Sequence, residues 1–217
     1  MSLGDAATDL RYLLDRGYPQ KSAVGFVCSH YRLDAEARYL LSRTVLAHEV
    51  AKMRRAKFLP CCKIEGSHII IDGYNVIIGM ENILQKKAYL CDDGVIRDIK
   101  GAFRNYKVSP DTETAVGLIF GFLKEMKPGN VVFLLDSQIS KSGMFASKLR
   151  EMILAAGLKG DARTSMHVDY DLKHSNDIVA SGDGVIIDEA ERAVNFLNCL
   201  VERFRHLEKG INPQTGI

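Results

Sequence analysis

The sequence lacks several features that would assign it to a special class of protein. No apolar stretch in its 217 residues approaches the roughly 18 to 20 residues that a membrane-spanning helix needs. The amino terminus has no succession of charged, apolar and small residues of the kind found in signal peptides. Internal repeats and low-complexity segments are absent. Because 47% of the residues are apolar, we expect a globular protein with a sizeable core. Because membrane-spanning and signal segments are lacking, we expect a cytoplasmic protein that does not contact a membrane.

Cysteine is scarce and is not spaced for a structural role. The five cysteines are odd in number and contain no C-x-x-C pair, so neither a disulfide framework nor a zinc ribbon is expected. Reduced and mostly buried thiols are the simplest interpretation. The adjacent Cys61 and Cys62 leave a redox role open.

The small net charge of +2 hides an uneven distribution. Residues 1–60 contain ten Lys and Arg against six Asp and Glu, whereas residues 61–217 contain nineteen against twenty-one. A basic segment followed by a mildly acidic one suits an anionic partner for the first and a carboxylate-lined site in the second. Solvated helices also display basic residues, so this distribution favours nucleic-acid binding only modestly.

The first 60 residues have apolar positions at helical spacing and no convincing strand. They predict one helix over residues 5–16, a short second helix after Pro19, and a third that begins after Asp34 and runs to about Lys57. Three such helices would form a small basic module with little core of its own. We therefore predict two units, a helical module over residues 1–60 and a second domain over residues 61–217.

After residue 60 the pattern changes to strands that alternate with helices. Strands are predicted at 69–72, 131–135, near 166–172 and at 178–180, with a hairpin over 88–99 and a final long helix capped by Asp188. Such alternation is typical of an α/β fold with a mostly parallel sheet covered by helices on both faces. The continuous apolar run before Asp72 fits a central strand of that sheet.

Three of these strands are followed by an aspartate: Asp72, Asp136 and Asp183. The carboxyl ends of parallel strands meet at one edge, which is where open α/β sheets bind ligands. Neighbouring carboxylates resist joint ionisation unless a cation neutralises them, and Mg²⁺ or Mn²⁺ prefers oxygen ligands. A divalent ion held there could activate water for hydrolysis of a phosphodiester.

The segment Ile71-Asp72-Gly73-Tyr74-Asn75, taken with Leu135-Asp136 and Ser181-Gly182-Asp183, resembles the PIN-like nucleases, especially their NYN branch. The resemblance covers roughly residues 66–208, and residues 9–18 resemble the amino-terminal module of uncharacterised archaeal proteins. It implies a Rossmann-like PIN-type α/β/α sandwich that cleaves RNA with Mg²⁺ or Mn²⁺.

The same resemblance implies roles for individual residues. Asp72 would be the central metal ligand, Asn75 its orienting neighbour, and Asp183 the acid after the later strand. Members of the family usually carry a further acid on a mid-domain helix, which has no clear counterpart here. Asp98 and Asp177 are the candidates for that additional metal ligand.

Hydroxyl and basic side chains near the predicted site are candidates for phosphate or RNA binding. A helix amino terminus attracts phosphate, and residues 140–142 open a predicted helix. Cations beside an aromatic residue, as around Tyr106, suit a single strand. The candidates are Ser140, Lys141, Ser142, Ser181, Arg97, Arg104 and Lys107.

Two alternatives stay open at this point. Asp169 and Asp171 would share one face of a strand near 166–172, which suits a toprim-like or phosphatase-like phosphotransfer enzyme. The other alternative is a catalytically inactive PIN-like protein that binds RNA or belongs to a complex. A homodimer is also possible, and the sequence does not select an RNA substrate.

Overall fold

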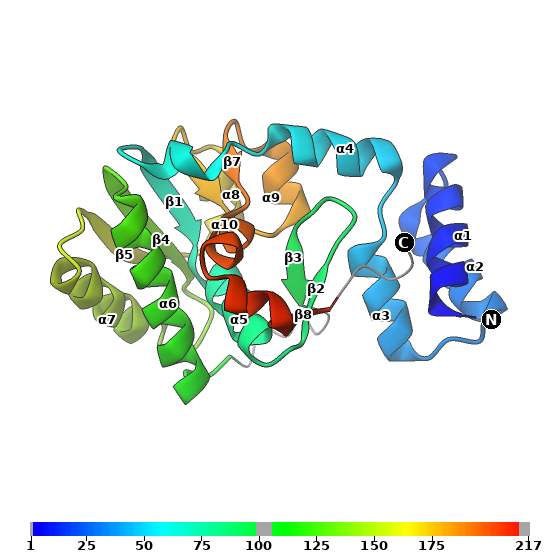
Figure 1. Ribbon diagram of the computed structural model, residues 1–217, viewed down its shortest axis with the longest axis horizontal. Helices are drawn as coiled ribbons and strands as arrows, with labels where there is room; N and C mark the ends of the chain where they lie inside the picture. Colours follow the sequence, from blue (N-terminus) through cyan, green and yellow to red (C-terminus); the bar gives the residue numbers. More distant parts are fainter. Residues whose placement is uncertain (1, 99–105, 213–217) are drawn as a thin grey trace.

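The computed structural model describes residues 2–98 and 106–212 (Figure 1). Its centre is a five-stranded parallel sheet in the order β5-β4-β1-β6-β7. The strands are β1 (His68–Asp72), β4 (Asn130–Asp136), β5 (Gly160–Ser165), β6 (Ile178–Ala180) and β7 (Ala193–Val194). The strand predicted to be central, β1, lies between β4 and β6.

Helices cover both faces of this sheet, which confirms the predicted fold class. Ile69 and Ile71 of β1 pack into one apolar cluster, whereas Ile70 between them packs into another. This alternation explains why residues 69–71 of the strand are all apolar. The first cluster includes α5 (Gly73–Leu84), α6 (Pro110–Met126), α7 (Ser142–Ala155) and α10 (Phe196–Arg203), and the second includes α8 (Val168–Lys173) and α9 (Gly184–Glu189).

The predicted hairpin is also present, at the side of the main sheet. Strands β2 (Ala88–Leu90) and β3 (Ile96–Asp98) pair antiparallel, and β8 (Ile211–Asn212) joins β2 in parallel. Short 3₁₀ helices occur at Cys61–Ile64 and Arg205–Gly210. Within residues 2–98 and 106–212, no helix is long and apolar enough to cross a membrane.

The amino-terminal part consists of helices only. They are α1 (Leu3–Asp15), α2 (Gln20–His30), α3 (Ala35–Thr44) and α4 (His48–Lys57). Leu10, Val27 and Leu41 belong to an apolar cluster that α1, α2 and α3 share. We call α1–α4 the helical module. In Figure 1, α4 leaves the other three helices and runs toward the α/β domain.

The prediction of one long third helix was wrong, because the chain becomes extended at Val45 between α3 and α4. The backbone N–H of Leu46 donates to the Asp92 carboxylate at 2.9 Å. The Asp92 N–H donates to the Thr44 carbonyl, also at 2.9 Å. Contacts with the turn between β2 and β3 therefore replace the helical hydrogen bonds at this point.

Two further predictions in the α/β domain were wrong. The expected strand near 166–172 is the helix α8, and the preceding strand β5 has the mostly polar sequence Gly160–Ser165 because it lies at the edge of the sheet. Asp188 does not cap the final helix. It lies within α9, and the final helix α10 begins after Asn195.

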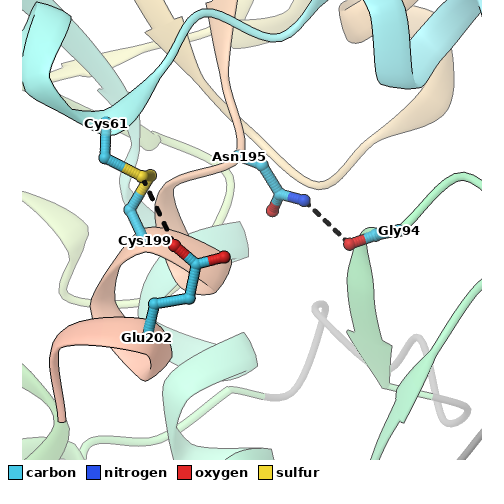
Figure 2. Close-up of a disulfide and its surroundings, with 5 residues drawn as sticks. All are labelled: Cys61, Gly94, Asn195, Cys199 and Glu202. Carbon is cyan, nitrogen blue, oxygen red and sulfur yellow. Dashed lines mark hydrogen bonds between the residues drawn. A yellow bond between two sulfur atoms is a disulfide. The ribbon is translucent and has the colours of Figure 1, made fainter. Parts of the chain in front are cut away.

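The expectation that all cysteines are reduced was wrong as well. Cys61 and Cys199 form a disulfide with Cα atoms 5.7 Å apart, which joins the start of the α/β domain to α10 (Figure 2). Glu202 lies beside it, with a carboxylate oxygen 3.9 Å from the Cys61 sulfur. Cys28 and Cys91 are buried outside the disulfide, as expected, and Cys62 is exposed. A single bond between positions 138 residues apart leaves no spacing signal in the sequence.

Candidate functional site

Asp72 lies at the carboxyl end of β1 and caps the amino terminus of α5. Its Oδ2 accepts a hydrogen bond from the Ser181 hydroxyl at 2.8 Å, and its Oδ1 accepts one from the Asn75 N–H at 3.4 Å. The Asn75 side chain in turn accepts the Gly182 N–H at 2.7 Å. The end of the central strand is thus tied to the loop 181–183 that follows β6.

The environment of Asp72 raises the pKa of its carboxyl group well above the ordinary value. Burial raises its pKa from 3.8 to about 7, although the hydrogen bonds from Ser181 and Asn75 act in the opposite direction. The negative charges of Asp169 and Asp183 raise the pKa further. A carboxyl group whose pKa lies near 7, at the edge of the sheet where ligands bind, is typical of functional sites.

The other two strand-end aspartates lie on the same edge of the sheet, as predicted. Asp183 caps α9, where its Oδ1 accepts the N–H of Val185 at 2.7 Å and that of Ile186 at 3.3 Å. Asp136 ends β4 and accepts the Gln138 N–H at 2.8 Å. In each carboxylate, Oδ1 binds backbone N–H groups of the segment that follows the aspartate.

These residues fit a hard divalent ion only in part. Over the described residues, no group of three or more His, Cys, Asp or Glu side chains is arranged to hold a metal ion. The donor chemistry at Asp72, Asp169 and Asp183 is nevertheless all oxygen. A cation would offset the burial and, to a smaller extent, the neighbouring negative charges that raise the Asp72 pKa. These few carboxylates suit a metal ion that keeps several water ligands, and they do not suit one whose ligands all come from the protein.

The two candidates for an additional metal ligand occupy different places. Asp98 ends β3 and forms an ion pair with Arg43 of α3 at 3.3 Å. Asp177 precedes β6 and lies 3.9 Å from the imidazole of His68, the first residue of β1. Asp177 is therefore at the amino-terminal edge of the sheet, and the structure does not bring it to Asp72.

Asp169 is the residue at this edge whose place the sequence did not reveal. It lies in the first turn of α8, directly after β5, and its charge acts on Asp72. The interpretation of residues 169 and 171 as neighbours on one strand face was wrong, because residues two apart on a helix do not face each other. Correct placement of the polar strand β5 would have identified Asp169 as a strand-end acid.

A cavity of about 280 Å³ adjoins this site, between the helical module and the α/β domain. The helical module supplies Gln20, Ser42, Arg43, Leu46 and Arg54 to its lining. The α/β domain supplies Asn75, Arg97, Asp98 and the loop that contains Asp183. The candidate site is therefore built from both parts of the chain.

Buried ion pairs hold the helical module against the α/β domain. Asp93, in the turn between β2 and β3, is fully buried and bonds to both Arg54 and Arg97. Burial acts to raise the pKa of Asp93, but the hydrogen bonds and charge of these arginines hold it below its ordinary value. Arg54 also bonds to Asp188 of α9 through two nitrogens, each at 2.7 Å. At the same turn, Arg11 of α1 binds Asp92 at 2.9 and 3.0 Å.

Arg97, a predicted phosphate-binding residue, is bonded to protein groups on both sides. Its Nη1 and Nη2 bond to Asp93 at 2.8 and 2.7 Å, and its Nε donates to the Gly182 carbonyl at 2.7 Å. All three guanidinium nitrogens therefore have protein partners. Arg97 therefore links the loop 181–183 to Asp93.

A second cavity, of about 900 Å³, collects several of the predicted phosphate-binding residues. Ser140, Lys141 and Lys107 line it together with Tyr74 and other residues. Ser142 is buried in the first turn of α7, and the predicted Arg104 lies outside the described residues. Burial and the charge of Asp136 raise the pKa of Tyr74 to about 12, so its hydroxyl stays protonated at neutral pH.

The fold is that of an α/β protein with a parallel sheet and an amino-terminal helical module. Aspartate side chains lie at the carboxyl edge of the sheet, and arginine and lysine side chains line the cavities beside them. Residues 61–199 match the family described as "Domain of unknown function (DUF5616)", and the chain belongs to that family. Residues 2–57 match a second family, "Protein of unknown function (DUF434)".

A full-length relative shows that the two parts occur together elsewhere. "Uncharacterized protein MJ0935" of Methanocaldococcus jannaschii is 34% identical over 210 residues, which are 96% of this chain and 100% of that protein. No solved structure matches the chain.

Proposed function

We propose that this protein is a divalent-metal-dependent nuclease that hydrolyses RNA phosphodiesters, as its resemblance to PIN-like and NYN nucleases implies. The observation that carries the proposal is the Asp72 carboxyl group. It stands at the end of the central strand with its pKa raised to about 7 and bonds to Ser181. RNA as partner and a cytoplasmic location belong to the same proposal.

The roles of the residues follow from their contacts. Asp72, with Asp183 or Asp169 beside it, would hold Mg²⁺ or Mn²⁺, which when bound supplies an activated water and neutralises charge on the phosphate. Ser181 and Asn75 orient Asp72, since Ser181 donates to its Oδ2 and Asn75 links it to Gly182. Burial of the carboxyl strengthens any electrostatic contact made there.

The surroundings of Asp72 suit an extended polyanion. The consecutive residues Tyr74 and Asn75 line different cavities, one containing Lys107 and Lys141 and the other containing Arg43. An RNA strand that crosses the sheet edge between these cavities would pass Asp72. Basic groups on both sides would contact its phosphates.

The test is cleavage of end-labelled single-stranded RNA with Mn²⁺, Mg²⁺ or EDTA by wild-type protein, Asp72→Asn and Asp177→Asn. Asp177→Asn is a matched control because it makes the same chemical change at the opposite edge of the sheet. We expect the wild type to cleave RNA only when a divalent metal is present. Asp72→Asn should lower the cleavage rate at least 100-fold, and Asp177→Asn should leave it unchanged.

Equal cleavage by wild type and Asp72→Asn would overturn the proposed site. RNA binding without cleavage by any of the three proteins would favour the alternative, a PIN-like protein that binds RNA and does not cut it.

A further inference from the structure

The cavity between the helical module and the α/β domain contains three arginines, and two of them are fully engaged by protein. Every guanidinium nitrogen of Arg97 bonds to Asp93 or Gly182. Every one of Arg54 bonds to Asp93 or Asp188. Their side chains are only 9% and 12% exposed, so these two arginines hold the walls of the cavity together.

Arg43 of α3 differs from them. Its ion pair from Nη2 to Asp98 is long at 3.3 Å, and 31% of its side chain is exposed. Its Nε is buried and has no hydrogen-bond partner among the described residues. Because protein atoms enclose that nitrogen, a ligand in the cavity would meet the exposed part of the Arg43 side chain and not its Nε.

The chemistry of the cavity indicates what that group is. A guanidinium matches the oxygens of a phosphate, to which it can donate two parallel hydrogen bonds. Gln20 and Asn75 offer amides, and Asp183 offers a carboxylate acceptor for hydroxyl or amino groups. A volume of about 280 Å³ lies just below the range of about 300 to 1,000 Å³ for small-molecule pockets, so the cavity suits a ligand no larger than one nucleotide.

We infer that this cavity receives one nucleotide of an RNA strand and that Arg43 of the helical module contacts its phosphate. The inference deepens the proposed function and rests on it for the identity of the ligand as RNA. It assigns the helical module a direct part in substrate binding, because Arg43, Ser42 and Gln20 all belong to that module.

The first test is binding of nucleoside 5′-monophosphates in EDTA, measured by isothermal titration calorimetry. Wild type should bind them, and Arg43→Gln should weaken binding at least about tenfold because it removes charge-assisted hydrogen bonds. Arg43→Lys keeps the charge but not the forked donors, so it should fall between the two. Arg38→Gln is the matched control, since Arg38 is an exposed arginine on the same helix, and its affinity should equal that of wild type.

Two results would overturn the inference: no nucleotide binding by wild type, or equal affinity of wild type and Arg43→Gln. If Arg43→Gln does not fold, the comparison of Arg43→Lys with wild type decides, because lysine still neutralises Asp98. Nucleosides without phosphate should bind about tenfold more weakly to wild type, and equal affinity for nucleoside and nucleotide would also contradict the phosphate contact.

RNA cleavage separates this inference from the proposed function. If both hold, Arg43→Gln should raise KM about tenfold with little change in kcat, whereas Asp72→Asn should abolish kcat. Arg43-dependent nucleotide binding without any cleavage by wild type would contradict the nuclease proposal and leave the binding site standing. Cleavage by Arg43→Gln with an unchanged KM would contradict the binding site and leave the nuclease standing.

Discussion

The Ser181 hydroxyl donates a hydrogen bond to the Asp72 carboxylate at 2.8 Å, across 109 residues of sequence. The same hydroxyl oxygen accepts the N–H of Asp183 at 3.1 Å. One serine therefore sets the position of two of the three strand-end aspartates. The Asn75–Gly182 hydrogen bond runs beside it and gives the loop 181–183 a second attachment to α5.

The raised pKa of Asp72 predicts a stability that depends on pH. Between pH 3.8 and about 7, the folded protein holds a proton at Asp72 that the unfolded chain releases. The free energy of unfolding must therefore decrease as the pH rises through this range. Asp72→Asn cannot ionise, so it should be more stable than wild type above pH 7, by on the order of 2 to 4 kcal/mol.

Urea unfolding at pH 4, 5.5 and 8 tests this prediction. The advantage of Asp72→Asn should be largest at pH 8 and should become small near pH 4, where Asp72 is protonated in the folded protein and already partly protonated in the unfolded chain. An Asn variant that is equally stable or less stable than wild type at pH 8 would show that Asp72 is ionised at little cost in the folded protein.

Asp93→Asn should destabilise the contact between the helical module and the α/β domain. The change removes the negative charge that neutralises Arg97, and it leaves Arg54 with one carboxylate partner in place of two. The side chains of both arginines are almost buried. Loss of one partner from a buried ion pair costs about 3 to 5 kcal/mol. The unfolding midpoint in urea should fall accordingly, while Asp171→Asn on the exposed surface of α8 should leave it unchanged. Equal midpoints for the two variants would contradict this account.

Gly73→Ala should be destabilising because the backbone at the start of α5 packs against β4. A Cβ atom there would lie 2.8 Å from the Leu134 carbonyl oxygen and 2.6 Å from the Leu135 side chain. Overpacking of this kind costs about 1 to 3 kcal/mol. Gly143→Ala in α7 meets nothing within 4 Å and should stay within about 0.5 kcal/mol of wild type. Thermal unfolding of both variants gives the comparison, and a Gly73→Ala variant as stable as Gly143→Ala would contradict it.

The parts of the fold that were predictable are those with a strong local signal. The apolar runs of β1, β4 and β6 identify buried parallel strands, and Asp72, Asp136 and Asp183 follow directly from the positions where those runs end. Strand β5 gave no such signal, since an edge strand of sequence Gly160–Ser165 buries only Ala162 well. The error at β5 placed Asp169 on a strand and concealed its proximity to Asp72.

Contacts between distant segments were beyond reach from a single sequence. Arg54 meets Asp188 across 134 residues, and Arg11 meets Asp92 across 81. Nothing in the local pattern around these residues distinguishes them from solvated surface charges. The break between α3 and α4 has the same origin, because Asp92 competes for the Leu46 N–H that a continuous helix would use.

The disulfide between Cys61 and Cys199 should contribute strongly to stability, because it closes a loop of 138 residues. Restriction of the unfolded chain by a loop of that length is worth up to about 5 kcal/mol, and disulfides typically contribute about 2 to 4 kcal/mol. Cys199→Ser should therefore lower the urea midpoint markedly under oxidising conditions. Dithiothreitol should bring wild type to nearly the same midpoint and leave Cys199→Ser unaffected.

Cys62→Ser changes an exposed cysteine next to the bond and should behave like wild type in both conditions. A wild-type midpoint that does not respond to reductant would mean that Cys61 and Cys199 remain thiols in solution and that other contacts of α10 hold it in place.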